Sequence, residues 1–281
     1  MSADLFITHG WAMALAALIG LIVGSTLNVV IHRLPRMLER HWQEDAALLR
    51  GEPIPKADRL NLFVPPSHCP ACQHRLGVAE LIPLASWLWL RGRCSACASP
   101  IALRYPLVEA AAAALFSLCV WRFGATVTSV AAMLLCTMLL AAAVIDLETH
   151  LLPDALTLPL IWSGLLVALG DGLVSLPDAV LGATAGYLSL WTIHHGFRLV
   201  TGREGMGYGD FKLFAALGAW LGWAMLPAVL LIAAASAALT TLGAAAIGRH
   251  DLRAPLAFGP WLAAAGLLAL FSGPSWPTLA P

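Results

Sequence analysis

The sequence is dominated by uncharged apolar segments that are long enough to cross a lipid bilayer. Two of them, Trp11–Ile31 and Thr126–Ile145, contain no formally charged side chain, and a spanning helix needs roughly 20 such residues. The chain of 281 residues is 59% hydrophobic and only 11% charged, which is too little charge to solvate the surface of a soluble protein of this length. The sequence therefore predicts an all-α polytopic membrane protein.

The apolar pattern predicts about eight transmembrane helices and one large hydrophilic insertion. Residues 1–31 are expected to form the first transmembrane helix, residues 32–104 the insertion, and residues 105–281 a helical membrane bundle. Inside the insertion, the mixed charges of Met37–Arg59 predict a surface helix. The predicted spans are about 11–31, 105–121, 126–145, 155–170, 176–197, 211–225, 228–247 and 256–272.

The basic residues predict which side of the membrane each loop faces. Ten of the sixteen Lys and Arg residues lie between Arg33 and Arg104, and five more flank the later loops on the same side; only Arg122 falls on the other. Loops rich in Lys and Arg stay in the cytoplasm. The insertion is therefore expected to be cytoplasmic, and both termini are expected to face the opposite side.

Four cysteines in the insertion form two Cys-x-x-Cys pairs separated by 21 residues. Each pair offers two thiolates, and two such pairs complete the tetrahedral sulfur shell that Zn²⁺ accepts. Disulfides are disfavoured in the cytoplasm, and four thiolates leave no open position, so we expect a structural zinc. The expected ligands are Cys69, Cys72, Cys94 and Cys97, and the neighbouring His68 and His74 are interpreted as surface histidines.

Two aspartates at the ends of apolar spans are candidates for chemistry. Asp146 ends the span 126–145 and begins a segment that also holds Glu148, His150 and Asp154, while Asp210 follows Gly205-Met-Gly207-Tyr-Gly209. Alone, the first could solvate a helix end and the second could be a helix N-cap. The glycines do not resemble a nucleotide loop, because no strand precedes them.

Taken together, the two aspartates predict an aspartyl protease. Both lie at the cytoplasmic membrane face in the predicted topology, and two carboxylates brought close together share one proton because both cannot ionise cheaply. One can then act as a general base on water while the other polarises the scissile carbonyl. This chemistry requires no metal.

These segments resemble the sequence motifs of the type IV prepilin peptidases. Gly205–Lys212 resembles the GxGD signature, and Asp146–Asp154 resembles the Asp-x6-Pro-Asp segment of that family. The four cysteines match as well. The motifs occur in the same order as in that family, and together they cover nearly the whole chain. The remaining matches are Gly24-Ser25-Thr-Leu-Asn28-Val-Val-Ile-His-Arg33-Leu34-Pro35, Tyr105-Pro106 with Glu109, and Phe258-Gly259-Pro260.

The resemblance implies catalytic roles for Asp146 and Asp210 and metal binding by the four cysteines. It further implies cleavage of prepilins or pseudopilins in the bacterial inner membrane, with the active site at the cytoplasmic face. Members with the cysteine-bearing insertion also N-methylate the new amino terminus with S-adenosylmethionine. No Rossmann-type glycine fingerprint outlines a site for this methyl donor. Glu109, a carboxylate inside an apolar span, is the one candidate contact, and a structural pair with Arg104 is the alternative interpretation of this residue. Nucleic acid is not an expected partner.

Two other functions are compatible with parts of the sequence. A proton-coupled carrier could use Asp146 and Asp210 as a relay, with His194 and His195 as further relay groups, although such residues are expected nearer the bilayer mid-plane. We interpret the two histidines as interfacial. A zinc-bearing assembly scaffold would leave the paired aspartates and the glycine-rich segment unexplained.

Overall fold

The computed structural model describes residues 3–53, 59–170, 172–203, 205–246 and 256–272. Within these ranges the chain is helical, and β-structure is limited to two isolated bridges. The chain divides into two compact units, Met1–Thr126 and Val127–Pro281. The helix that follows the insertion therefore belongs to the first unit together with the insertion itself.

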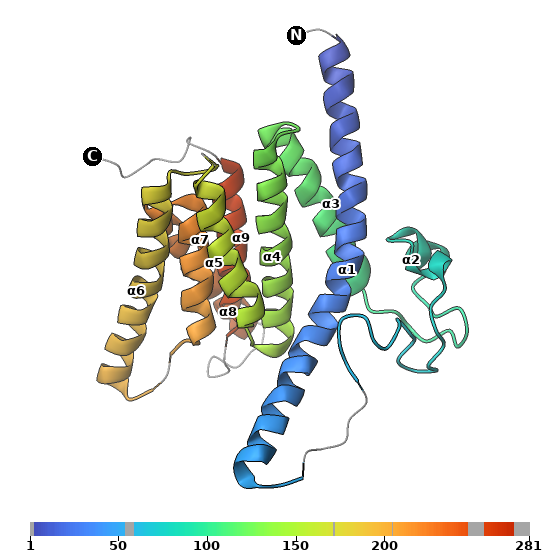
Figure 1. Cartoon of the computed structure of the whole chain (residues 1–281), viewed down its shortest axis with the longest axis horizontal. Helices are drawn as coiled ribbons and strands as arrows, with labels where there is room; N and C mark the ends of the chain where they lie inside the picture. The colour runs from blue at the N-terminus through green and yellow to red at the C-terminus, as the bar shows by residue number, and fades with distance from the viewer. Residues whose placement is uncertain (1–2, 54–58, 171, 204, 247–255, 273–281) are drawn as a thin grey trace. The chain divides into compact units, whose positions relative to one another are not determined.

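The first unit is organised by one long helix, α1 (Ala3–Arg50). Its 48 residues correspond to about 72 Å at 1.5 Å per residue, more than twice the thickness of a bilayer core. The sequence predicts a separate surface helix within Met37–Arg59. In the structure, the part of this segment up to Arg50 instead continues the first transmembrane helix, which passes through Pro35 without ending. Figure 1 shows α1 changing direction along its length, and Pro35, which lacks an N–H, is a residue that can cause such a change.

Helix α3 (Arg104–Phe123) packs against α1 through small residues. A Cβ built on Gly20 would lie 2.7 Å from the carbonyl oxygen of Ala112, and one built on Gly24 would lie 2.7 Å from Cα of Glu109. The hydrophobic effect does not drive helices together inside a membrane, so close packing of small residues of this kind stabilises their contact instead. The segment between α1 and α3 carries the short helices η1 (Val78–Leu81) and α2 (Ala85–Trp89).

In the second unit, helix α7 (Tyr208–Leu221) is buried along nearly its whole length. It packs against α5 (Asp154–Ala168), α6 (Leu176–Thr201) and α9 (Gly259–Ser272). Gly182 and Gly186 of α6 face Gly218 and Phe214 of α7 with no room for a side chain at either glycine of α6. The indole N–H of Trp220 donates to the Leu160 carbonyl at 2.8 Å, which joins α7 to α5. The remaining elements are α4 (Val127–Thr149), η2 (Trp223–Met225) and α8 (Leu226–Ala246).

Each of the eight predicted spans coincides with a helix, namely α1 and α3 to α9. Four helical segments are long and apolar enough to cross a membrane: His9–Arg50, Arg104–Phe123, Val127–Thr149 and Trp223–Ala246. Helices α5 and α9 are apolar but shorter. The fold is therefore that of a polytopic α-helical membrane protein. Arg249 and Arg253, which the topology prediction counts, lie outside the described residues.

Candidate active site and metal centre

Asp146 lies in the last turn of α4 and is only 5% exposed. Its Oδ2 atom accepts a 2.9 Å hydrogen bond from the backbone N–H of Gly259, the first residue of α9. The carboxylate is therefore satisfied by the backbone of another helix. Burial of this kind argues against the simpler interpretation, in which an aspartate solvates the end of a membrane helix.

Asp210 lies in the first turn of α7 and is 8% exposed. The N-cap of this helix is Gly207, whose backbone is extended and whose carbonyl accepts the Asp210 N–H at 3.2 Å. Asp210 is thus not the N-cap residue. Its Oδ1 atom is buried and has no hydrogen-bond partner among the described residues, an arrangement that is rare unless the group has a further role.

The two carboxyl groups are close enough for the charge of Asp146 to act on Asp210. Leu152, in the turn between α4 and α5, lies beside Gly209, which precedes Asp210, and beside Gly259, which is hydrogen-bonded to Asp146. A Cβ built on Gly209 would lie 2.5 Å from Cβ of Leu152, and one built on Gly259 would lie 3.2 Å from its Cδ1. The two glycines therefore form a notch that accepts Leu152 and lets α7 and α9 meet at the end of α4.

The other acidic and basic residues of this region have separate roles. The Lys212 ammonium lies 2.5 Å from Oδ1 of Asp154 and joins the start of α5 to α7. His150 has a positive φ of 54°, and its N–H donates to the Asp146 carbonyl as the chain leaves α4. Glu148 is exposed. None of these four side chains takes the place of either aspartate.

His194 and His195 differ in their surroundings. The His194 ring is 3% exposed, lies 5.6 Å from the Tyr208 ring and 5.4 Å from the Phe211 ring, and has no hydrogen-bond partner within the described residues. His195 is partly exposed and stacks on Trp191 at 4.1 Å between ring centroids. His194 of α6 therefore packs against the aromatic rings of Tyr208 and Phe211 on α7.

The four cysteines of the first unit converge on one point. Their Sγ atoms all lie within 4.8 Å of one another, with 3.8 Å between Cys69 and Cys97 and 4.0 Å between Cys72 and Cys94. A tetrahedral site with Zn–S bonds of about 2.3 Å has sulfur–sulfur edges of about 3.8 Å. All four are free thiols. The cluster therefore has the donors and spacing of a metal site.

The two halves of the cluster have the same backbone design. Cys69 N–H donates to the His74 carbonyl and Cys94 N–H to the Ser99 carbonyl, each at 2.9 Å. Each knuckle also has one residue at positive φ, Gln73 in the first and Ala98 in the second. Two equivalent turns thus present two thiols each to a shared centre.

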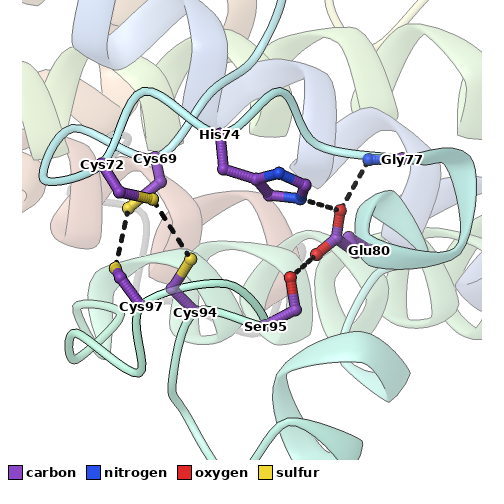
Figure 2. A network of polar contacts seen from close by, with 8 residues as sticks. All are labelled: Cys69, Cys72, His74, Gly77, Glu80, Cys94, Ser95 and Cys97. Carbon is purple, nitrogen blue, oxygen red and sulfur yellow. Dashed lines mark hydrogen bonds and ion pairs between the residues drawn. The ribbon is translucent and has the colours of Figure 1, made fainter.

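Hydrogen bonds tune the thiols and join the two knuckles. Hydrogen bonds from the backbone N–H of Cys72 and from the Ser99 hydroxyl lower the pKa of Cys69 to about 6, which favours the thiolate that a metal needs. Although the His74 N–H acts in the same direction on Cys72, burial and the neighbouring thiols raise the pKa of Cys72 to about 12. Glu80 accepts hydrogen bonds from the Ser95 hydroxyl and from the Gly77 N–H, and both hold its pKa below its usual range. His74 approaches the same carboxylate at 3.3 Å, as Figure 2 shows. Through Glu80, His74 of the first Cys-x-x-Cys turn is therefore linked to Ser95 of the second turn.

Buried polar residues of α1 and α3 hold the insertion in place. The Asn28 amide donates to the Tyr105 carbonyl at 3.1 Å, and Arg33 donates to the carbonyls of Asn61 and Pro65 at 3.0 and 2.6 Å. Glu109, 8% exposed, accepts the Leu84 N–H on Oε2 at 2.8 Å.

Comparison with known proteins gives two family models that match separate parts of the chain. The bacterial peptidase A24 N-terminal domain matches residues 18–123, and the type IV leader peptidase family matches residues 133–242. A prepilin leader peptidase/N-methyltransferase of Aeromonas hydrophila is 50% identical over 280 residues, covering 98% of this chain and 97% of the relative. The protein of the same description from Pseudomonas putida is 48% identical over 261 residues, covering 93% and 91%.

The chain belongs to the type IV leader peptidase family. The type IV leader peptidase match contains Asp146 and Asp210, and the N-terminal match contains the four cysteines and Glu109. The two matched ranges lie on either side of the boundary between the compact units. No solved structure matches the chain.

One functional contact of the aspartates was missed by the sequence interpretation. Phe258-Gly259-Pro260 was noted only as part of the resemblance, with no role assigned to it. Its glycine supplies the N–H to Asp146 and borders the notch for Leu152. The glycine at a predicted helix start was the available signal, but its partner is 113 positions away in the sequence.

Proposed function

We propose that this protein is an inner-membrane aspartyl endopeptidase that removes the leader from type IV prepilins or type II secretion pseudopilins. The observation that supports this proposal is a pair of buried carboxyl groups from separate helices, close enough for the charge of one to act on the other, with Asp146 also bonded to a backbone N–H of a third helix. The names of full-length relatives at about 50% identity support the same substrate class.

The reaction requires one proton shared between Asp146 and Asp210. One carboxylate takes a proton from a water molecule, which attacks the scissile carbonyl, while the other carboxylic acid donates a hydrogen bond to the carbonyl oxygen. The tetrahedral intermediate then collapses as a proton passes to the leaving amine. The buried Oδ1 of Asp210, which lacks a partner in the described residues, is available for the water or the carbonyl.

The proposed site faces the cytoplasm. Fifteen of the sixteen basic residues fall on the predicted cytoplasmic side, and Asp146 and Asp210 lie at helix ends on that side. A substrate whose apolar helix stays in the bilayer would present its leader junction at this depth.

We further propose that the cysteine cluster binds one structural Zn²⁺. The donors are four thiols with near-tetrahedral spacing, and four sulfur ligands leave no position for water. The zinc would therefore stabilise the insertion and take no part in peptide hydrolysis.

Methylation of the new amino terminus is the second proposed activity, and S-adenosylmethionine is the expected donor. When bound, this compound supplies a methyl group carried on a sulfonium cation. Glu109 is the proposed contact because a buried carboxylate stabilises a nearby cation. Its Oε2 accepts the Leu84 N–H at 2.8 Å, which fixes the carboxylate relative to the start of α2.

A single mass spectrum tests the proposed activities. Membranes containing the protein are incubated with a prepilin and S-adenosylmethionine, and the product's amino terminus is measured. A peptidase gives the shortened chain, and a bifunctional enzyme gives the shortened chain plus one methyl group. Unchanged substrate would support the carrier interpretation instead.

A further inference from the structure

Several large apolar side chains of the cysteine-bearing module project away from its interior. On α2, Ala85, Leu88 and Trp89 occupy one side of the helix at i, i+3 and i+4 spacing, and Leu88 and Trp89 are 67% and 84% exposed. Val78, Leu81 and Ile82 on and after η1 are exposed as well. We call Ala85, Leu88 and Trp89, which share one side of α2, the apolar face of the module.

The opposite side of α2 is packed inside the module. The Trp87 indole N–H points to the Ile101 carbonyl at 3.4 Å, and a Cβ built on Gly92 would lie 2.9 Å from the same ring. Leu90 is only partly exposed. The module therefore has its own interior, and the apolar face is a separate surface that a water-exposed domain would not present.

Hydrogen bonds fix the depth of α2 relative to the membrane helices. The N–H of Leu84, the N-cap of α2, donates to Glu109 at 2.8 Å. Glu109 lies five residues into α3, about 7 Å from the helix start, and its backbone also touches Gly24 of α1. Both helices are long and apolar enough to cross a membrane. The start of α2 is therefore held where α1 and α3 enter the bilayer.

The residues at this depth have the chemistry of a membrane interface. Trp side chains concentrate at the boundary between hydrocarbon and headgroups, and apolar faces of short helices insert there when basic residues flank them. Arg91 and Arg93, two and four residues after Trp89, are exposed, so their guanidinium groups can reach lipid phosphates while their stems lie along apolar surface.

We propose that the apolar face of the module lies in the interfacial layer of the bilayer, with Arg91 and Arg93 on lipid phosphates. The insertion is then a monotopic element seated on the membrane between α1 and α3. Its docking to lipid would hold the cysteine cluster at a constant height above the bilayer.

Photo-crosslinking in lipid tests this proposal without reference to cleavage. The full-length protein, with p-benzoylphenylalanine replacing Trp89 or, separately, Leu88, is placed in nanodiscs of phosphatidylethanolamine and phosphatidylglycerol and irradiated. Gln73, exposed on the first knuckle, is the matched control position. Mass spectrometry of the digested protein then counts adducts that carry a whole phospholipid.

The expected result is a phospholipid adduct at positions 88 and 89 with a yield several-fold above that at position 73. Equal yields at all three positions would overturn the proposal, as would adducts at 88 and 89 made only with protein, either prepilin or a second copy of this chain. Using two positions guards against misfolding of one variant. A negative result leaves the proposed peptidase activity untouched, because the readout is lipid contact.

Discussion

At the scale of single residues, the candidate active site depends on backbone groups and on positions where no side chain fits. Asp146 receives its hydrogen bond from a main-chain N–H, and Leu152 occupies space that exists only because positions 209 and 259 are glycine. The sequence predicted the two aspartates because both end apolar spans at the same predicted membrane face and both lie in motifs that resemble those of the family. It could not predict Gly259, because no local pattern joins residues 113 positions apart.

Substitution of Gly259 by Ala should impair cleavage without unfolding the protein. The new Cβ would lie 2.7 Å from Oδ2 of Asp146 and would displace the carboxylate. Displacement of a reacting group by about 1 Å can cost about 100-fold in rate, so we expect a loss of about 10- to 100-fold in the single-turnover rate. Gly243→Ala is the control, since nothing lies within 4 Å of its Cβ. Equal rates in the two variants would contradict the role of Gly259.

At the scale of helices, the sequence predicted where each helix lies along the chain better than where it ends. Each predicted span coincides with a helix, because long apolar runs are a strong local signal. The continuation of α1 to Arg50 was missed, because charged residues after Pro35 suggested a separate surface helix. The packing of α7 against α6 was also beyond prediction: Gly182 and Gly218 are separated by a loop, and their contact depends on the geometry of both helices.

Gly182→Ala should destabilise the second unit. Its Cβ would overlap the Gly218 carbonyl, which is backbone and cannot move aside, and overpacking of this kind costs about 1–3 kcal/mol. Gly196→Ala on the same helix has nothing within 4 Å and should be neutral or stabilising. Thermal unfolding in detergent compares the two. A Gly182→Ala protein as stable as the Gly196→Ala protein would show that α6 and α7 do not pack as described.

At the scale of the whole molecule, the proposed mechanism requires the insertion and both aspartates to face the same side of the membrane. Reporter fusions at residues 60 and 205 should both report the cytoplasm, because fifteen of sixteen basic residues fall on one side of the predicted topology and such loops stay in the cytoplasm. A periplasmic signal at either position would overturn the topology and with it the access of substrate to the aspartates.

The metal prediction also belongs to the whole molecule, because it separates the insertion from the bundle. Purified protein should contain about one zinc per chain by elemental analysis, as four thiols form one tetrahedral site. Cys72→Ser should lower the zinc content while the membrane bundle stays folded, and Cys119→Ala, a buried cysteine of α3, should not. Full zinc content in a protein with all four ligands replaced by Ser would exclude the site.

Cleavage by variants of the two aspartates is the most direct test of the central claim. Asn is nearly isosteric with Asp but cannot accept a proton as a carboxylate does, so Asp146→Asn and Asp210→Asn should each abolish cleavage with normal expression and zinc content. The double variant should be no worse than either single one, because the pair acts as a unit.

Two nearby carboxylates supply the controls. Glu148→Gln should retain activity because its side chain is exposed, and Asp154→Asn should retain activity because its partly exposed pair with Lys212 contributes little energy. The decisive measurement is the single-turnover rate of prepilin cleavage by all five proteins. Loss of cleavage in the Asp146 and Asp210 variants alone is the predicted result, and a wild-type rate from Asp146→Asn or Asp210→Asn would contradict the proposed mechanism.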